Sequence, residues 1–408
     1  MVGSSQDSSH WLRVKELSDA LPESRERDEL GSLACAQLLA VGARIGTSAE
    51  AMGELFREGE AFARRSDSTH ALARLLSAYG MYRLSTTGRR RGAVGMLEKA
   101  VALMEETGDL GGQIACRYNL TIAEVLHDPV AALRLCDEAE ERIGVDPRPG
   151  LAALGLPPRP LFYWLKSIVL GYTGRFAETE RMVEAIRETG GEQFGFASGS
   201  ASSLAAERGE SERALFWAHE SLARALALGR IPVLELLAQL RLGEAHLLGQ
   251  RWDEALEAHE RSRALIREHG ANLNTEVLSL LGIAQACLGR GDLERATAIA
   301  DESVALSLSR DQTVVEAQSR TLRARVRTRR LGADQQSASL ADLERSSEIV
   351  AELGLRALEH EVLEARAELA RALGDEATRR RQLRDALHCC MELGASGHAR
   401  RLEGELTS

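Results

Sequence analysis

The residues that could bind a metal or act as nucleophiles are few and poorly spaced. Each His-Glu pair lacks the second histidine, four residues further on, that a zinc-binding HExxH helix requires; these pairs begin at His219, His259 and His360. His246 and His259 fall in one predicted hairpin, but two imidazoles without a third ligand make a poor zinc site. Helical spacing assembles neither a Ser-His-Asp nor a Cys-His set. We therefore predict no catalytic residue and no metal site.

Nucleotide chemistry also lacks its sequence signature. The chain has no GxxxxGK[ST], and its lysines, Lys15, Lys99 and Lys166, do not follow a glycine. The glycine-rich stretch 190–200 does not show the order strand, GxGxxG, helix, so we interpret it as a connection between hairpins. The six cysteines form no CxxC pattern, which is typical of buried thiols. We expect no cofactor and no enzymatic activity.

Aromatic side chains make up only 4% of the sequence, yet several gather in one region. The stretch PRPLFYWLKSIVLGY (158–172) holds Phe162, Tyr163 and Trp164, and it is followed by Phe194 and Phe196. We predict that these five residues form a partner-binding pocket, because aromatic anchors often carry binding energy. The alternative is that these aromatic side chains fill the hydrophobic core where the proline-rich sequence interrupts the stacking of the helices.

The stretch RTLRARVRTRR (320–330) is a second candidate site. On a helix, four of its arginines would lie along one side and could attract an anion or a nucleic acid; they are Arg320, Arg323, Arg327 and Arg330. The alternative is a paired face, because the next predicted helix carries acidic residues able to neutralise the arginines; they are Asp342, Glu344, Glu348 and Glu352.

Composition and charge indicate which kinds of partner and which cellular compartment to expect. The net charge of -10 and pI of about 5.6 argue against a general nucleic-acid binder, which needs a clustered basic face. No apolar run reaches the roughly 20 residues of a membrane span. The first residues, MVGSSQDSSHW, lack the basic start and apolar centre of a signal peptide. We expect a cytoplasmic protein with no membrane partner.

The elements that would position these residues repeat along the chain. A turn, a large apolar residue, two polar residues, an alanine and an apolar helix recur at 173–186, 208–226, 247–265 and 289–306, with a weaker copy at 87–104. The alanines Ala214, Ala255 and Ala296 are each 41 residues apart. Further marker alanines are Ala93, Ala132 and Ala377. A segment whose apolar residues recur with the helical period of 3.6 precedes each of these repeated segments. The repeating unit is therefore predicted to be an antiparallel helix pair.

The repeated segment 247–265 also predicts structural roles for three of its residues. Gly249 is expected in the turn after a helix, because glycine tolerates the left-handed conformation. Ala255 is expected to let two helices approach closely, and Trp252 to fill the space beside the turn. We therefore interpret all three as packing and turn residues.

The predicted fold is all-α, a right-handed α-solenoid of about nine antiparallel hairpins in which neighbours cover one another's apolar faces. The hairpins are placed at 28–65, 70–107, 112–143, 160–189, 192–228, 231–269, 273–309, 313–353 and 356–393, with a helix near 9–20 and a capping helix at 396–406. N-terminal repeats would occupy 1–143, a proline-rich interruption 144–160, serving as a hinge or as a loop over the groove, and C-terminal repeats 161–408.

The repeated segments resemble tetratricopeptide repeats, although their spacing exceeds the usual length of about 34 residues. The best-matched unit, 236–269, contains Leu242, Gly243, Trp252 and Ala255. Residues 16–65 and 373–406 are similar to the start and end of one tetratricopeptide-like region, the C-terminal region of large bacterial signalling proteins. In those proteins a nucleotide cyclase, or another output domain, precedes a signal-transduction ATPase; large helix-turn-helix activators carry similar arrays.

The resemblance implies a sensor or scaffold arm in a bacterial signalling or regulatory system. We expect a non-enzymatic scaffold that binds a protein or peptide in its concave groove. Two alternatives remain open: a regulatory domain that senses a small-molecule effector, and a fragment of a cyclase or ATPase signalling enzyme whose catalytic domains are absent from these residues.

Overall fold

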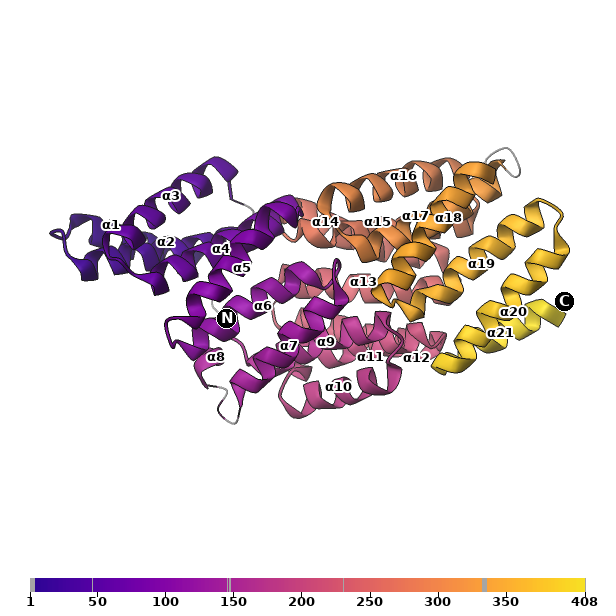
Figure 1. The fold of residues 1–408 in the computed structure, drawn as a ribbon, viewed down its shortest axis with the longest axis horizontal. Helices are drawn as coiled ribbons and strands as arrows, with labels where there is room; N and C mark the ends of the chain where they lie inside the picture. The colour runs from indigo at the N-terminus through magenta and orange to yellow at the C-terminus, as the bar shows by residue number, and fades with distance from the viewer. Residues whose placement is uncertain are drawn as a thin grey trace. The chain divides into compact units, whose positions relative to one another are not determined.

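A computed structural model describes residues 4–45, 47–144, 146, 148–229, 231–331 and 336–407. These ranges contain 21 α-helices, two short 3-10 helices and no strand (Figure 1). The first helices are α1 (Ser4–Ala20), α2 (Arg25–Ile45), α3 (Ala49–Arg65), α4 (Thr69–Thr87), α5 (Arg91–Glu105), α6 (Leu110–Glu124), α7 (Pro129–Ile143) and α8 (Arg148–Leu154). The all-α class predicted from the sequence is confirmed.

The rest of the chain continues in the same manner. Its helices are α9 (Pro158–Tyr172), α10 (Phe176–Glu188), η1 (Glu192–Phe194), α11 (Phe196–Glu207), α12 (Ser211–Ala227), α13 (Pro232–Leu248), α14 (Trp252–His269), η2 (Leu273–Thr275), α15 (Glu276–Arg290), α16 (Leu293–Arg310), α17 (Thr313–Leu331), α18 (Gln336–Leu353), α19 (Arg356–Ala372), α20 (Glu376–Leu393) and α21 (Ser396–Thr407). Each of the nine predicted hairpins corresponds to two consecutive helices. The predicted capping helix is α21.

Contacts divide the chain into two compact units. Unit 1 comprises residues 1–124, 134–162 and 266–275. Within it, α2 packs against α1, α3 and α4, and α5 packs against α4 and α6. Buried apolar side chains such as Cys35, Leu39 and Leu75 fill the space between these helices. The proline-rich segment predicted to interrupt the repeats contains the short helix α8, which packs against α6.

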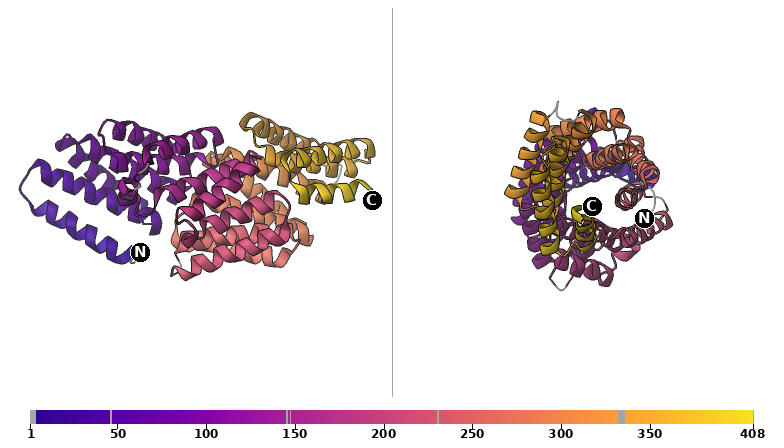
Figure 2. Two further views of the ribbon diagram at one scale, coloured as in Figure 1. Left: turned by 90° about the horizontal axis from the view of Figure 1, so that it is seen from below. Right: turned by 90° about the vertical axis from the view of Figure 1, so that its right-hand side faces the viewer.

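Unit 2 comprises residues 125–133, 163–265 and 276–408. The helix pairs α11 with α12, α15 with α16, α17 with α18 and α19 with α20 pack side by side, and first helices of successive pairs also touch, as α11, α13, α15, α17 and α19 show. In the right-hand view of Figure 2 the orange and yellow helices of this unit follow one another around a curve. Each pair thus covers the apolar face of its neighbour.

The marker alanines explain how closely the helices pack. Ala93, Ala132, Ala214, Ala255 and Ala296 are all fully buried. The sixth, Ala377, is exposed, so its predicted packing role is wrong. The reason is that the repeated segments of α16 and α20 were aligned in the wrong register. Both Asp292 and Asp375 accept a capping hydrogen bond at the start of a helix, and counting from these caps places Arg379, not Ala377, where Ala296 stands.

At the turn between α13 and α14, the packing roles predicted for Trp252 and Ala255 are confirmed. The left-handed conformation predicted for Gly249 is wrong. Trp252 packs against the buried core around Ala255 and lies so close to Gly289 that a side chain at that position would overlap its ring. The left-handed residue, however, is Gln250, with φ of 57°, while Gly249 has φ of -80°. Glycines do take the left-handed conformation in other turns, including Gly174 and Gly291.

Across the described parts of the chain, no helix combines the length and the apolar character needed to cross a bilayer.

Candidate functional site

The five aromatic residues predicted to form a pocket fall into two groups. Phe162 lies in unit 1, where it is only 1% exposed and packs edge-to-face against Tyr118, with ring centroids 5.8 Å apart. Its carbonyl oxygen lies 3.8 Å from the Cys136 Sγ, which can donate to it. Phe162 is therefore part of an apolar core in this structure.

Three of the other aromatic side chains meet in unit 2. The rings of Trp164 and Phe196 are stacked with centroids 5.1 Å apart, and Phe194 lies 5.7 Å from Phe196. Phe196 is buried, whereas Trp164, Phe194 and Tyr163 keep part of their surface accessible. We call Trp164, Phe194 and Phe196 the aromatic cluster. It remains a candidate binding surface, and it joins the middle of α9 to η1 and the start of α11.

Three of the four arginines in the predicted anion patch are paired within the protein. Asp342, which is 3% exposed, lies 3.0 Å from Arg320, 2.6 Å from Arg323 and 2.9 Å from Arg327. Asp301 and Glu316 add further acidic partners. Arg330, the fourth, is exposed at the end of α17. The internal pairing that we considered as the alternative is thus present for three of the four side chains.

Unit 2 also closes on itself. The amide of Gly397 in α21 donates to the carbonyl oxygen of Arg208 over 2.8 Å, and the ring of His398 is hydrogen-bonded to the carbonyl of Ala206 at 3.1 Å. In Figure 1 the yellow helix α21 lies beside α12, at the turn that follows α11. Because nearly 190 residues separate these segments, the contact joins distant repeats of the unit.

Inside unit 2, polar side chains from several first helices lie close enough to influence one another electrostatically. They are Tyr172 on α9, Glu207 on α11, Arg241 and Glu244 on α13, and Glu361 on α19; we call them the inner cluster. Arg241 pairs with Glu244 at 2.8 Å and donates to Ser203 at 2.6 Å. Among the described residues, Glu207 and Glu361 form no ion pair and no side-chain hydrogen bond.

Burial and like charges perturb the inner carboxyl groups. Burial, followed by the charges of Glu361 and Glu244, raises the pKa of Glu207 to about 8. Burial raises the pKa of Glu361 to about 7, although the charge of Arg325 opposes the shift. The pKa of Glu244 is also raised by burial. Glu207 and Glu361 can therefore hold a proton near neutral pH, and a positively charged partner would favour its release.

Sequence reasoning missed the inner cluster. Glu207 is the last residue of α11, a position at which glutamate is usually exposed, so nothing in the local sequence separates it from an ordinary surface glutamate. The available signal was that all five residues fall on the first helix of a predicted pair, which lines the inner side of such arrays. Only the curvature of unit 2 brings them together.

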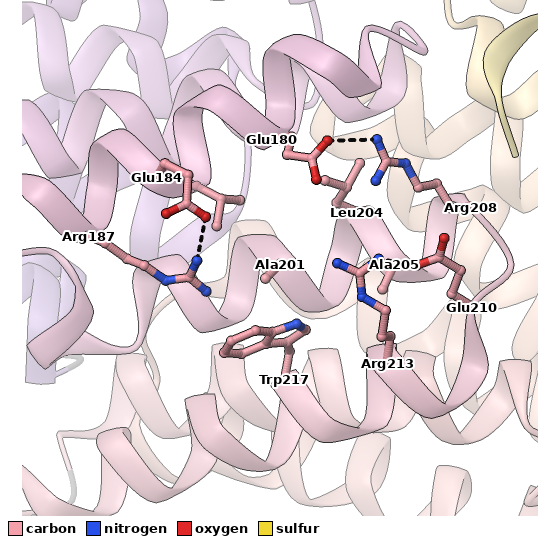
Figure 3. Close-up of a pocket in the computed structure, with 11 residues that line it drawn as sticks. Glu180, Glu184, Arg187, Ala201, Leu204, Ala205, Arg208, Glu210, Arg213 and Trp217 are labelled. Carbon is pink, nitrogen blue, oxygen red and sulfur yellow. Dashed lines mark hydrogen bonds and ion pairs between the residues drawn. The ribbon is translucent and has the colours of Figure 1, made fainter.

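A shallow pocket of about 50 Å³ lies elsewhere in unit 2, between α10 and α12 over α11 (Figure 3). Val183, Leu204 and Ala205 give it an apolar lining, and the guanidinium of Arg187 lies 4.7 Å from the centre of the Trp217 ring. Charged side chains surround it in pairs: Glu180 with Arg208 at 3.2 Å, Glu184 with Arg187 at 2.6 Å, and Glu210 with Arg213 at 2.9 Å. Pairing leaves this rim without a dominant charge.

His246 and His259, which the sequence places in one hairpin, contact different neighbours. His246 faces His219, with ring centroids 6.3 Å apart, and His259 packs between Gly243 and Gly282. No group of three or more metal-ligating side chains occurs among the described residues.

Several solved structures are similar to this chain. A Rap protein complexed with Competence and Sporulation Factor is 11% identical over 96% of this chain and 99% of its own, with a TM-score of 0.46. A signal transduction ATPase with a tetratricopeptide repeat sensor, from Pyrococcus horikoshii, is 14% identical over 89% of this chain and 52% of its own, with a TM-score of 0.45. The apo form of RapI is 10% identical over 98% of each chain, with a TM-score of 0.38.

No family model matches the sequence, and no curated protein matches it either. At identities of 10–14% the likenesses describe an arrangement of helices and assign no partner to this chain.

Proposed function

We propose that this chain is a non-enzymatic repeat scaffold that binds a protein or peptide partner along the inner side of unit 2. One observation carries the proposal: side chains from α9, α11, α13 and α19, four different helix pairs, lie close enough to influence one another electrostatically. A repeat array gains such a surface because its first helices stack side by side. Glu207 and Glu361, which have no internal partner among the described residues, are available to a ligand.

The aromatic cluster supplies the apolar part of this proposed surface. Trp164 and Tyr172 both lie on α9, and eight residues of helix span about 12 Å. A bound segment could therefore place an apolar side chain against Trp164 and a polar one near Tyr172 and Glu207. Scaffold arms of signalling proteins bind partners in this way, and we place the chain in that class.

Photo-crosslinking from a side chain of the aromatic cluster tests the proposal. Trp164 is replaced by a photoreactive phenylalanine derivative, and Phe216, 58% exposed on α12, is replaced in a matched control. Irradiation in cells that produce the chain should attach a partner at position 164 only. The Glu361→Arg variant should weaken that crosslink at least tenfold. A partner captured at position 216 and not at 164 would contradict the proposed surface.

A second candidate function is the sensing of a small molecule, for which the shallow pocket beside Trp217 is the position to test. A thermal-shift screen of metabolites distinguishes the two. A ligand that raises the melting temperature in the wild type but not in Trp217→Ala, with no protein crosslinked at position 164, would favour sensing. Nucleotide turnover by the purified chain, abolished by a point mutation in it, would overturn the non-enzymatic assignment.

A further inference from the structure

The contact that closes unit 2 leaves no space for an added side chain. A Cβ at Gly397 would overlap the carbonyl oxygen of Gly209, and a Cβ at Gly209 would overlap the amide of His398. The two backbones therefore touch directly. One amide-to-carbonyl hydrogen bond and one imidazole-to-carbonyl hydrogen bond join them, as described above.

Two histidine rings lie at this contact. The imidazoles of His360 on α19 and His398 on α21 have centroids 4.7 Å apart. His360 is 6% exposed, and its Nδ1 is hydrogen-bonded to the carbonyl of Ala357 at 2.8 Å. In His398 the Nε2 is held by the carbonyl of Ala206, while the buried Nδ1 has no hydrogen-bond partner among the described atoms. A carbonyl oxygen can only accept, so the ring nitrogen that faces it carries a hydrogen in each histidine.

The charges around the two rings are already balanced. Arg401 on α21 pairs with Glu364 on α19 at 2.7 Å. Arg325 on α17 acts on the same pair, and α20 contributes the neutral thiol of Cys390. The turn after α11 presents backbone carbonyls and no acidic group to the rings. A proton added to either ring would therefore create an uncompensated positive charge beside Arg401 and the other imidazole.

We propose that the contact between α21 and the α11–α12 turn is an acid-sensitive clasp, closed while His360 and His398 are neutral and released when they become protonated. Release would separate the last helix of unit 2, α21, from the turn between α11 and α12. The inference concerns the clasp alone, so it does not depend on the proposed function.

The direction of the pH effect follows from the pKa values in the closed state. Burial, followed by the charge of His398, lowers the pKa of His360 to about 4, and burial also lowers the pKa of His398. A histidine with a lowered pKa stabilises the closed state above its ordinary pKa of about 6.5 and loses that contribution as pH falls toward the lower value. Between pH 7.5 and pH 5 the protonation of His360 alone shifts the equilibrium toward the open state by about 30-fold.

Hydrogen exchange read by mass spectrometry tests the clasp in the full chain. After correction for intrinsic rates, the peptides covering 394–407 and 205–212 should exchange faster at pH 5 than at pH 7.5. Peptides of α15 serve as an internal reference. In the double variant His398→Gln, His360→Leu the amide of glutamine can still donate to Ala206, and exchange should stay slow at pH 5.

A steric pair of variants checks the location. Gly397→Ala should open the clasp at pH 7.5, while Gly404→Ala, in the same helix but with open space around its Cβ, should not. If the histidine variant does not fold, NMR titration of the two imidazoles in the wild type decides instead. Ordinary pKa values near 6.5, or exchange at 394–407 that acid leaves unchanged, would overturn the proposal.

Discussion

Asp342 shows how a single side chain can change the meaning of a basic stretch. It is buried on α18 and lies within 3.0 Å of Arg320, Arg323 and Arg327. The sequence predicted both the row of arginines and the acidic helix that follows, but not which acidic residue would be buried among them. That choice depends on the angle between α17 and α18, which is set by packing.

Replacing Asp342 by asparagine should destabilise the chain by about 3 kcal/mol, because three partly buried guanidinium groups would lose their shared carboxylate. The midpoint of urea unfolding measures the change. Glu344→Gln, on the exposed side of the same helix, is the matched control and should stay within about 0.5 kcal/mol of wild type. Equal effects of the two substitutions would show that the arginines do not depend on Asp342.

At the scale of elements, the helix pairs were predictable and the details of their packing were not. Apolar periodicity and turn residues place nine hairpins within a few residues of the observed helices, because both signals are local. Ala377 was misassigned because a capping aspartate shifts the register of α20. Gln250 takes the left-handed position next to Gly249, a choice between neighbours that composition does not settle.

His259 illustrates a contact between elements that no local pattern reveals. Its ring is 1% exposed, packs between Gly243 on α13 and Gly282 on α15, and has no hydrogen-bond partner on either nitrogen among the described atoms. Burial lowers its pKa to about 3. The two glycines in effect make room for the ring.

The variant His259→Leu should therefore be more stable than wild type by about 1 kcal/mol at pH 7, because it removes two buried polar atoms without partners. Its advantage should grow as pH falls below about 6.5, where the buried imidazole resists protonation and the wild type loses stability. Gly282→Ala should instead cost about 2 kcal/mol through overpacking against the ring. Thermal unfolding at pH 5 and pH 7 measures both; a leucine variant less stable than wild type would contradict this view of His259.

At the scale of the whole molecule, the division into two units and the closure of unit 2 lie beyond sequence reasoning. Both depend on contacts between residues far apart in the chain, such as Arg208 with Gly397. The aromatic stretch shows the same limit: Phe162 and Trp164 are two residues apart but belong to different units. Spacing along a helix predicts which side chains share a face, and it does not predict what faces them.

The inner cluster predicts how the stability of the whole molecule depends on pH. Since the pKa of Glu207 is raised to about 8 by burial and by neighbouring carboxylates, the folded state holds a proton that the unfolded chain releases above about pH 4.5. Stability should therefore fall as pH rises from about 5 to 8. Glu207→Gln, which stays neutral, should remove a loss of about 2 kcal/mol across that interval, an amount reduced from the full shift because the side chain is partly exposed.

Urea unfolding at pH 5 and pH 8 measures this difference, and Glu212→Gln, an exposed position on α12, is the control that should leave the pH profile unchanged.

A partner that binds inside unit 2 through a basic group should lower the pKa of Glu207 and release its proton. Binding heats measured in two buffers of different ionisation enthalpy would then differ more in the wild type than in Glu207→Gln, which keeps only the contribution of the other inner carboxyl groups. Heats that agree in both proteins would place the partner away from Glu207.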